Sequence, residues 1–340
     1  MDLSEVLQQL TEGAGVSGAE IGTAKVIEKY LSKYGKTYTD RLGNLICELD
    51  GEGEPFLLSA HMDRVGMIVT YITDEGFLRV DNCGRIDNRT LCAQQVTVHA
   101  KEELKGVVIS TPPHLQGADT KRKALNTNEA LIDIGLSAER ARELVALGDR
   151  VTVDSAFLSL AGDRFACHAF DDRAGVASIL YALEILRERE NSRKITVAFT
   201  TREETGGSGA RVASFNSDAS ELIAVDVSFA KTPDSKAEEC GVLGKGPMIG
   251  IAPSLDCGAS EKLRQLAVEK NIPYQLEIMS GMTGTDADSM TCAADGLVSS
   301  LISIPLRYMH TGVEVISLSD IENTGSLIAE YILSGGAVNA

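Results

Sequence analysis

The chain has 340 residues, of which 44% are hydrophobic and 24% charged, a composition typical of a soluble globular protein with one large domain or two. Its formal net charge of -17 disfavours nucleic acid and anionic membranes as partners, because both are themselves negatively charged. The absence of Trp and the low aromatic content of 5% argue against an aromatic-lined sugar groove.

The sequence carries no recognisable export or cross-linking signal. The segment MDLSEVLQQLTEG lacks the cationic start and apolar core of a signal peptide, and no apolar run is long enough to span a bilayer. The seven cysteines are scattered without a CxxC pair, which argues against a disulfide framework and against a thiolate zinc site. We therefore expect a cytoplasmic protein with no membrane partner and with buried, reduced thiols.

Residues 1–65 predict two helices, a hairpin and a buried strand, in that order. Apolar residues spaced three and four apart indicate helices over Leu3–Leu10 and Ile21–Tyr34. The alternating segment Thr37–Leu49 is typical of a hairpin. The apolar run Pro55–Ala60 predicts a strand that is buried on both faces, and it leads directly into His61.

Residues 66–157 differ in sequence pattern from the residues before them and are predicted to form an inserted, β-rich, barrel-like domain. Gly, Asn and Asp separate several short β-type segments. These segments are Met67–Ile72, Phe77–Val80, Gln95–His99 and Gly106–Ser110. The polar stretch Gln116–Asn128, with its basic run Lys121, Arg122 and Lys123, is expected to be a mobile, solvated loop. A helix is expected over Ser137–Leu147.

From Phe165 onward, helices and strands alternate again. The expected helices are Asp171–Glu188, one starting at Ala210, Lys262–Lys270, Asp286–Ala294 and Leu318–Leu333. The expected strands are Ile195–Phe199, Leu222–Val225, Tyr274–Met279 and Leu297–Pro305. This alternation predicts an α/β fold, with a mixed, mostly parallel sheet covered by helices. Residues 1–65 and 158–340 would together form this discontinuous domain.

Polar side chains with metal-binding chemistry follow the predicted buried strands, at their ends or in the next turn. They are His61, Asp63, Asp171, Glu203, Glu204, Asp226 and His310. In a parallel sheet, ligands bind outside the carboxyl ends of the strands. Carboxylates and imidazoles without a thiolate suit zinc, cobalt or manganese. Each residue alone is weak evidence, but their convergence favours a site for two metal ions.

A dinuclear site needs one bridging carboxylate and further ligands on each side. Five residues meet this need. The first ion takes one His and one Asp, the second takes one Glu and one His, and a further Asp is shared by both. A sixth carboxylate then remains as the base for a bridging water. The adjacent Glu203 and Glu204 can divide these tasks, one holding a metal ion and the other handling a proton. Asp63 is well spaced to accept the second imidazole N–H of His61.

Six segments together resemble the tetrahedral (TET-type) cytosolic metallo-aminopeptidases. That family contains glutamyl, leucyl and deblocking aminopeptidases, and some of its members carry the name endoglucanase. The segments are HMDRVGMIV (His61–Val69), FDDRAGVASILYALEIL (Phe170–Leu186), TREETGGSGARVASF (Thr201–Phe215), VDVSFAKTPD (Val225–Asp234), GTDADSM (Gly284–Met290) and SIPLRYMHTGVEVISLSDIENT (Ser303–Thr324). The similarity covers nearly the whole chain, in order and including the β-rich insertion.

The resemblance implies a zinc-peptidase type of fold and a role for each candidate residue. His61 and Asp226 would bind one metal ion, Glu204 and His310 the other, Asp171 would bridge them, Glu203 would be the general base, and Asp63 would support the ligands from behind. The peptide bond between Asp171 and Asp172 would be cis. The cofactors would be two divalent ions per subunit, zinc or cobalt, with manganese as a third candidate.

The family's activity and assembly are implied in the same way. A metal-activated water would cleave the first peptide bond of short peptides that have a free α-amino group. The protein would be a homo-oligomer, in the form of a hollow tetrahedral dodecamer. The insertion, residues 66–157, would make contacts between subunits.

The preference for the N-terminal residue depends on two basic side chains. HMDRVG, FDDR and VDVSFAKTPD are most similar to the leucyl-preferring members, which implies a neutral or hydrophobic pocket with Met282, Thr283 and Gly284 among its walls. In the alternative, Arg64 or Arg202 reaches the pocket and pairs with an acidic side chain, so that the enzyme is a glutamyl aminopeptidase.

Other function classes explain fewer of the candidate residues. A glycosidase would use Glu203 and a second acid, and would leave both histidines and the two aspartates at the strand ends without a role. A catalytically silent scaffold would be expected to lack a ligand, and none is missing. A metallo-deacetylase or carboxypeptidase remains as a neighbouring chemistry. His99, His114 and His168 are not expected to bind metal.

Overall fold

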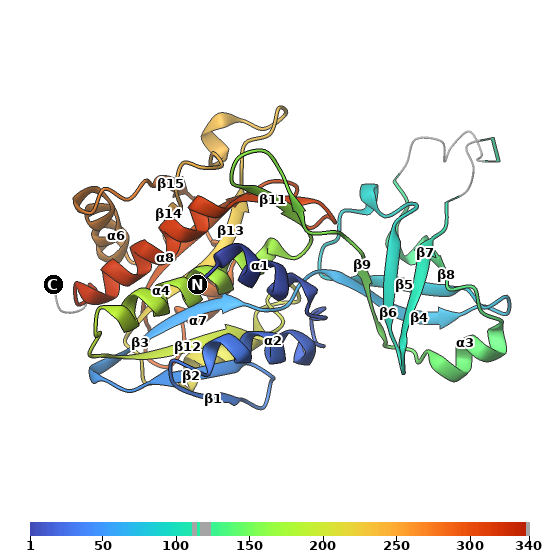
Figure 1. Ribbon diagram of the computed structural model, residues 1–340, viewed down its shortest axis with the longest axis horizontal. Coiled ribbons are helices and arrows are strands. Elements are labelled where there is room, and N and C mark those ends of the chain that lie inside the picture. Colours follow the sequence, from blue (N-terminus) through green and yellow to red (C-terminus); the bar gives the residue numbers. More distant parts are fainter. Residues whose placement is uncertain (111–113, 116–123, 338–340) are drawn as a thin grey trace.

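The computed structural model describes residues 1–110, 114–115 and 124–337, which form an α/β part and a separate barrel (Figure 1). Most of the loop expected over Gln116–Asn128, including Lys121, Arg122 and Lys123, lies outside the described residues. No helix among the described residues combines the length and the apolar character that a membrane span requires.

An eight-stranded mixed sheet is the centre of the α/β part. In spatial order its strands are β1 (Lys36–Thr39), β2 (Leu45–Leu49), β12 (Arg193–Thr200), β3 (Glu52–His61), β13 (Glu221–Phe229), β16 (Val298–Leu306), β14 (Met248–Ile251) and β15 (Gln275–Ile278). Strands β12, β3, β13 and β16 run parallel to one another, and β2 and β14 flank them in antiparallel pairing. The expected mixed, mostly parallel sheet is therefore confirmed.

Helices cover both faces of this sheet. One face carries α1 (Leu3–Glu12), α2 (Ile21–Leu31), α4 (Phe170–Glu188), α6 (Cys257–Glu269) and α8 (Leu318–Leu333), and the other carries α5 (Ser208–Phe215) and α7 (Asp286–Met290). The neighbours Leu57 and Leu58 of β3 are fully buried on opposite faces, because successive strand residues point in opposite directions. This two-sided burial explains the continuous apolar runs in the sequence.

The inserted region forms a closed six-stranded antiparallel barrel with a core of its own. Around the barrel the strands are β4 (Gly66–Ile72), β5 (Leu78–Cys83), β8 (Leu131–Asp133), β7 (Glu103–Val108), β6 (Gln95–His99) and β9 (Arg150–Val153). Its apolar cluster is separate from the clusters of the large sheet, and α3 (Ala138–Leu144) packs beside it. Figure 1 shows the barrel projecting from one end of the α/β part.

A small sheet that the sequence pattern did not predict joins two distant segments. It consists of β10 (Leu158–Ser159), β11 (Arg164–Cys167) and β17 (Glu314–Ser317). These strands are too short to show alternation. The pairing of Cys167 with Glu314 places Glu314 next to the start of α4.

Other details also differ from the expectations: the helices expected over Ile21–Tyr34 and Ser137–Leu147 end at Leu31 and Leu144, and strands β8, β9 and β14 were not expected. Helix α7 ends at Met290 instead of Ala294, whose φ of +51° lies in the left-handed region. Helix α6 begins five residues before Lys262, because the side chain of Asp256 caps it by accepting the N–H of Ala259 at 2.8 Å. The structure also contains the short 3-10 helices Asn88–Thr90, Thr127–Glu129 and Ala237–Glu239.

All seven cysteines are free thiols, as expected, but they are not all buried. Cys47, Cys83 and Cys167 are buried and Cys240 is half-buried, whereas Cys92, Cys257 and Cys292 are exposed. The exposed three lie in loops or at a helix start, where no strand or helix covers them.

Candidate metal centre

Strand register brings the predicted ligands to one edge of the sheet. His61 is the last residue of β3 and pairs with Thr200 at the end of β12. Ala224 of β13 pairs with Ser59 of β3, so Asp226 comes level with His61 two residues further on. Parallel pairing therefore places the two side chains, more than a hundred and fifty residues apart, beside each other.

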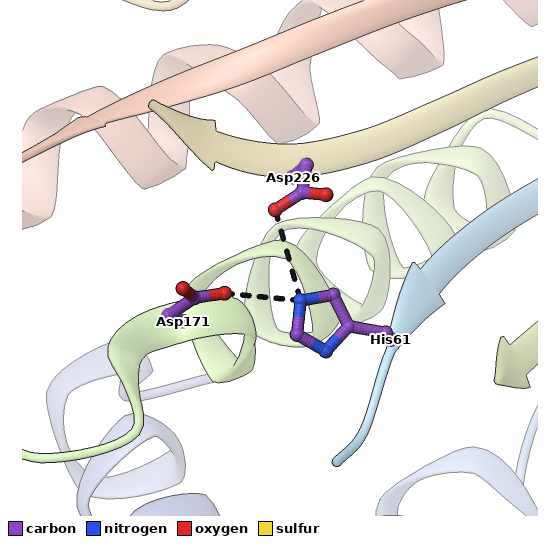
Figure 2. Close-up of side chains that lie close together, drawn as sticks. All are labelled: His61, Asp171 and Asp226. Carbon is purple, nitrogen blue, oxygen red and sulfur yellow. Dashed lines mark hydrogen bonds and ion pairs between the residues drawn. The ribbon is translucent and has the colours of Figure 1, made fainter. Parts of the chain in front are cut away.

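One ring nitrogen of His61 faces two carboxylates, and its other ring nitrogen faces a third residue. Its Nε2 lies 3.0 Å from Oδ1 of Asp171 and 3.7 Å from Oδ1 of Asp226 (Figure 2). Its Nδ1 lies 3.2 Å from the main-chain oxygen of Asp63 and 3.5 Å from the carboxylate of that residue. A proton on Nδ1, donated to Asp63, leaves the Nε2 lone pair facing both aspartates, which is the tautomer that a metal ligand requires.

Asp171 also belongs to a second group of donor atoms. Its Oδ2 lies 3.2 Å from Nε2 of His310, which in turn lies 3.4 Å from Oε2 of Glu204. Within each group, His61–Asp171–Asp226 and Asp171–Glu204–His310, the donor atoms all lie within 4.8 Å of one another. The Asp171 carboxylate is thus common to both groups, with one oxygen turned to each.

The donor atoms fit divalent metal ions. All six are carboxylate oxygens or imidazole nitrogens, and no thiolate is among them, which suits zinc, cobalt or manganese. Oε1 of Glu204 is buried and has no hydrogen-bond partner among the described residues, which is costly unless a cation lies beside it. Burial raises the pKa of Glu204, and repulsion by Asp171 raises it further. A cation between these carboxylates would remove that repulsion.

The carboxylates of the second group also change the pKa of its histidine, His310. Burial lowers the pKa of His310, but its hydrogen bonds to Asp171 and Glu204 outweigh burial and raise the pKa to about 11. The attraction that holds a proton on this imidazole would equally favour a divalent cation at its Nε2.

Two buried carboxylates hold the loops that carry these predicted ligands. Asp63 accepts the backbone N–H groups of Glu203 at 3.0 Å and Glu204 at 3.2 Å. Glu314 accepts those of His310 at 2.9 Å and Asp171 at 3.2 Å. The sequence analysis missed Glu314. The available signal was a single carboxylate within an otherwise apolar run that follows His310 by four residues.

Left-handed backbone conformations occur in or beside the segments that carry the predicted ligands. Ala169, Arg202 and His310 have φ values of +59°, +60° and +63°, which are uncommon for residues other than glycine. Such conformations persist where the surroundings enforce them and cluster at functional sites. The bond between Asp171 and Asp172 is cis, as the family resemblance implied.

The turn after β12 depends on glycine. A Cβ atom at position 209 would lie 2.2 Å from the main-chain oxygen of Thr201, so only glycine allows α5 to start directly beside the strand end. The buried Asn44 side chain ties the two together, accepting the N–H of Thr201 and donating to the oxygen of Gly209, both at 2.9 Å. Glu203 and Glu204 are thereby held at the sheet edge.

Glu203 belongs to neither donor group but lines the same cavity of about 630 Å³. Burial raises the pKa of Glu203 to about 9, with added repulsion from Asp226, Asp286 and Glu204, although His61 acts in the opposite direction. A carboxylate whose charged form is disfavoured is well suited to accept a proton. Asp286 accepts a hydrogen bond from Thr200.

The walls of the cavity decide which side chains could meet a substrate. The apolar residues Phe229, Met282, Leu301 and Met309 line it, together with Thr283 and Gly284 from the predicted pocket segment. Neither Arg64 nor Arg202 lines it. Two other arginines, Arg85 and Arg211, do so and are exposed. The half-buried Glu277 also contributes a carboxylate.

Among the described residues, the two donor groups include none of His99, His114 and His168. Nε2 of His99 lies 2.9 Å from the hydroxyl of Thr152 in the barrel, and Nε2 of His168 lies 3.0 Å from the main-chain oxygen of Thr11. Thr285 caps α7 as expected, because its hydroxyl accepts the N–H of Ala287 at 3.2 Å.

Comparison with known proteins identifies a family that matches most of this chain. The family model described as M42 glutamyl aminopeptidase matches residues 43–327. The lysyl aminopeptidase of Pyrococcus furiosus is 34% identical over 326 residues, which cover 94% of each chain. The structure of an aminopeptidase from the archaeon Desulfurococcus kamchatkensis matches with a TM-score of 0.92 and 31% identity, covering 99% of this chain and 96% of that one. The TET1 peptidase of Pyrococcus horikoshii, described as able to assemble into a tetrahedron or a large octahedral shell, matches with a TM-score of 0.85 and 33% identity, covering 97% of this chain and 98% of that one.

Proposed function

Because the chain belongs to the M42 glutamyl aminopeptidase family, and is therefore a metal-dependent hydrolase of peptide bonds, we propose that it removes single N-terminal residues from short peptides at a centre of two metal ions. The observation that carries this proposal is the shared carboxylate of Asp171, which presents one oxygen to each donor group. A glycosidase would leave His61 and His310 without a role.

The five ligands divide between two ions around that shared carboxylate. His61 and Asp226 would hold one ion, Glu204 and His310 the other, and Asp171 both. Bound zinc or cobalt, or manganese, would lower the pKa of a water molecule and polarise the scissile carbonyl. Glu203 would take the proton of that water and deliver it to the leaving amine. Asp63 and Glu314 would keep the ligand loops in place.

We propose a neutral or hydrophobic N-terminal side chain as the preferred one. The apolar walls Phe229, Met282, Leu301 and Met309 support this preference. The glutamyl alternative rested on Arg64 or Arg202, and neither of them lines the cavity. Arg85 and Arg211 could replace them in that role, but both are exposed, so solvent would screen their attraction for a substrate carboxylate.

A second candidate is a preference for basic N-terminal residues, and it rests on Glu277. Oε1 of this residue accepts a hydrogen bond from Ser228, whereas Oε2 is buried without a partner among the described residues. Ser228 lies two residues after Asp226 on β13, so both side chains point to the same side of the strand. An ammonium group of a lysine substrate would satisfy the free oxygen, as in an enzyme of lysyl specificity.

We also propose that the protein is a homo-oligomer, in the form of a tetrahedral dodecamer, with the barrel in the subunit contacts. The description of the TET1 peptidase as a tetrahedral or octahedral shell supports the first part. Exposed apolar side chains on and beside the barrel strands, Tyr71, Val107 and Leu147, support the second.

The proposed reaction is tested with leucine p-nitroanilide and its N-acetylated form. The protein stripped of metal by a chelator should be inactive, and zinc, cobalt or manganese should restore cleavage of the free-amine substrate only. Full activity without bound metal, or equal cleavage of the acetylated substrate, would contradict the proposal. Measuring the metal content of the same samples links the recovery of activity to occupancy.

A further inference from the structure

A second cavity, of about 470 Å³, lies where the barrel meets the α/β part. We call it the junction cavity. Its walls come from α1, from the barrel strands β6, β7 and β9, and from the end of β11. None of the metal-centre residues lines it, and its volume is that of a small-molecule site.

Arg64 is a buried cation in the wall of this cavity that lacks an anionic partner. Its side chain and backbone together are only 5% exposed, and Nε has no hydrogen-bond partner among the described residues. Within the part of the chain that the structure describes, no carboxylate forms an ion pair with its guanidinium. Burial of a charged group without an ionic partner is unfavourable, because the group loses its hydration and gains no attraction in return. An anion in the cavity would remove that cost.

The nearest acidic groups are already engaged elsewhere. Glu314 and Asp154 attract Arg64 from a distance. Glu314 accepts the backbone N–H groups of His310 and Asp171, and Asp154 pairs with Lys105 at 2.9 Å and accepts a hydrogen bond from Thr97 at 2.6 Å. Of the other acids in the wall, Glu12 and Glu103 are exposed. Of the two permanent cations in the wall, Arg64 and Lys105, Arg64 is therefore the one without an ion pair among the described residues.

His168 adds an acceptor to the same wall. Its Nε2 faces the main-chain oxygen of Thr11 at 3.0 Å and so carries the proton of the neutral ring. Nδ1 is then a lone-pair acceptor, and it is buried with no partner in the part of the chain that the structure describes. Burial lowers the pKa of His168 well below its usual range, and the charge of Arg64 lowers it further, so the ring stays neutral at physiological pH.

We propose that the junction cavity binds a small oxyanion that carries a hydroxyl proton at neutral pH, as inorganic phosphate does, outside the metal centre. The guanidinium of Arg64 would pair with two of its oxygens, which is the geometry that Arg favours with phosphate and carboxylate groups. The neutral His168 would accept the remaining O–H at Nδ1. A carboxylate or a sulfate would satisfy Arg64 alone, because neither carries such a proton at neutral pH.

The test measures binding of inorganic phosphate to the metal-loaded protein by calorimetry at constant ionic strength, with sulfate and acetate as comparators. We expect phosphate to bind more tightly than sulfate, and Arg64→Met to weaken phosphate binding by about tenfold or more. Arg85→Met is the matched control, since Arg85 lines the metal cavity, and it should leave this binding unchanged. His168→Gln should reduce phosphate affinity to that of sulfate without changing sulfate affinity.

If Arg64→Met does not fold, a substitution at the surface still tests the proposal. Gln8→Glu adds one negative charge at the exposed rim of the cavity with no change of shape. It should weaken phosphate binding about two- to fivefold, since the introduced charge repels the anion through partly screened solvent. No phosphate binding by the wild-type protein at millimolar concentration would overturn the proposal. So would binding that is unchanged in Gln8→Glu, or binding that is lost in Arg85→Met instead.

Discussion

The carboxylate of Asp63 accepts the backbone N–H of Glu203 at 3.0 Å, and its second oxygen accepts that of Glu204 at 3.2 Å. The main-chain oxygen of the same aspartate faces Nδ1 of His61 at 3.2 Å. One fully buried residue therefore couples the end of β3, which carries a proposed ligand, to the turn after β12, which carries the proposed base and a second ligand. Asp63 acts by positioning, and it lines no part of the metal cavity.

We expect Asp63→Asn to lower both stability and turnover. The amide of Asn offers one oxygen in place of two, so one buried N–H of Glu203 or Glu204 loses its acceptor, at a cost of about 1–3 kcal/mol. Thermal unfolding and steady-state kinetics measure the two effects. Asp2→Asn is the matched control, because Asp2 also accepts two backbone N–H groups but is exposed at the start of α1, where Asn caps equally well. Equal effects of the two substitutions would exclude a positioning role.

Glu203→Gln and Asp171→Asn should separate proton transfer from metal binding. Since Glu203 belongs to neither donor group, Glu203→Gln should retain the metal and lose turnover by about 10²–10⁴-fold. Asp171 serves both groups, so Asp171→Asn should lower the metal content itself. Elemental analysis and steady-state kinetics on each purified variant measure metal content and turnover separately. Metal loss in Glu203→Gln with full occupancy in Asp171→Asn would show that the proposed roles are reversed.

Glu277→Gln should distinguish the two candidate specificities. If the free Oε2 binds a substrate ammonium group, the variant should lose about tenfold in kcat/KM for lysine p-nitroanilide relative to the leucine substrate. Cleavage of the glutamate substrate should improve, because a repelling charge is removed. Glu75→Gln, on an exposed barrel turn, is the control. If the ratio of kcat/KM for the lysine and leucine substrates is unchanged, the basic preference is excluded and the neutral preference stands.

The barrel is expected to carry subunit contacts. Leu147 is 64% and Tyr71 51% exposed, so a lysine at each position should weaken association without disturbing the barrel core. Sedimentation velocity should find a large oligomer for the wild-type protein and smaller species for Leu147→Lys with Tyr71→Lys. Far-UV circular dichroism checks that the double variant is folded. A wild-type monomer at micromolar concentration, or an oligomer that the double variant leaves intact, would contradict this expectation.

Much of the fold and the set of donor residues followed from the sequence alone. The strands of the parallel sheet are buried on both faces, so they appear as continuous apolar runs, and polar residues directly after such runs come to one edge of the sheet. The sequence predicts His61, Asp226 and Glu204 as donors in this way. The helices followed from the spacing of their apolar residues, although α2, α3, α6 and α7 differ at their ends.

Contacts between distant segments determined the rest. The two-residue strand β10 and the four-residue strands β11 and β17 have too little sequence to form a pattern, yet their pairing places Glu314 beside Asp171. The direction of Arg64 depends on the loop after β3, where its backbone bonds to Gly15 and Ser17, and it faces the junction cavity instead of the substrate. Local sequence specifies which side chains can bind a metal ion or an anion. The packing of distant segments decides which of them meet, because a side chain's neighbours are set by long-range contacts.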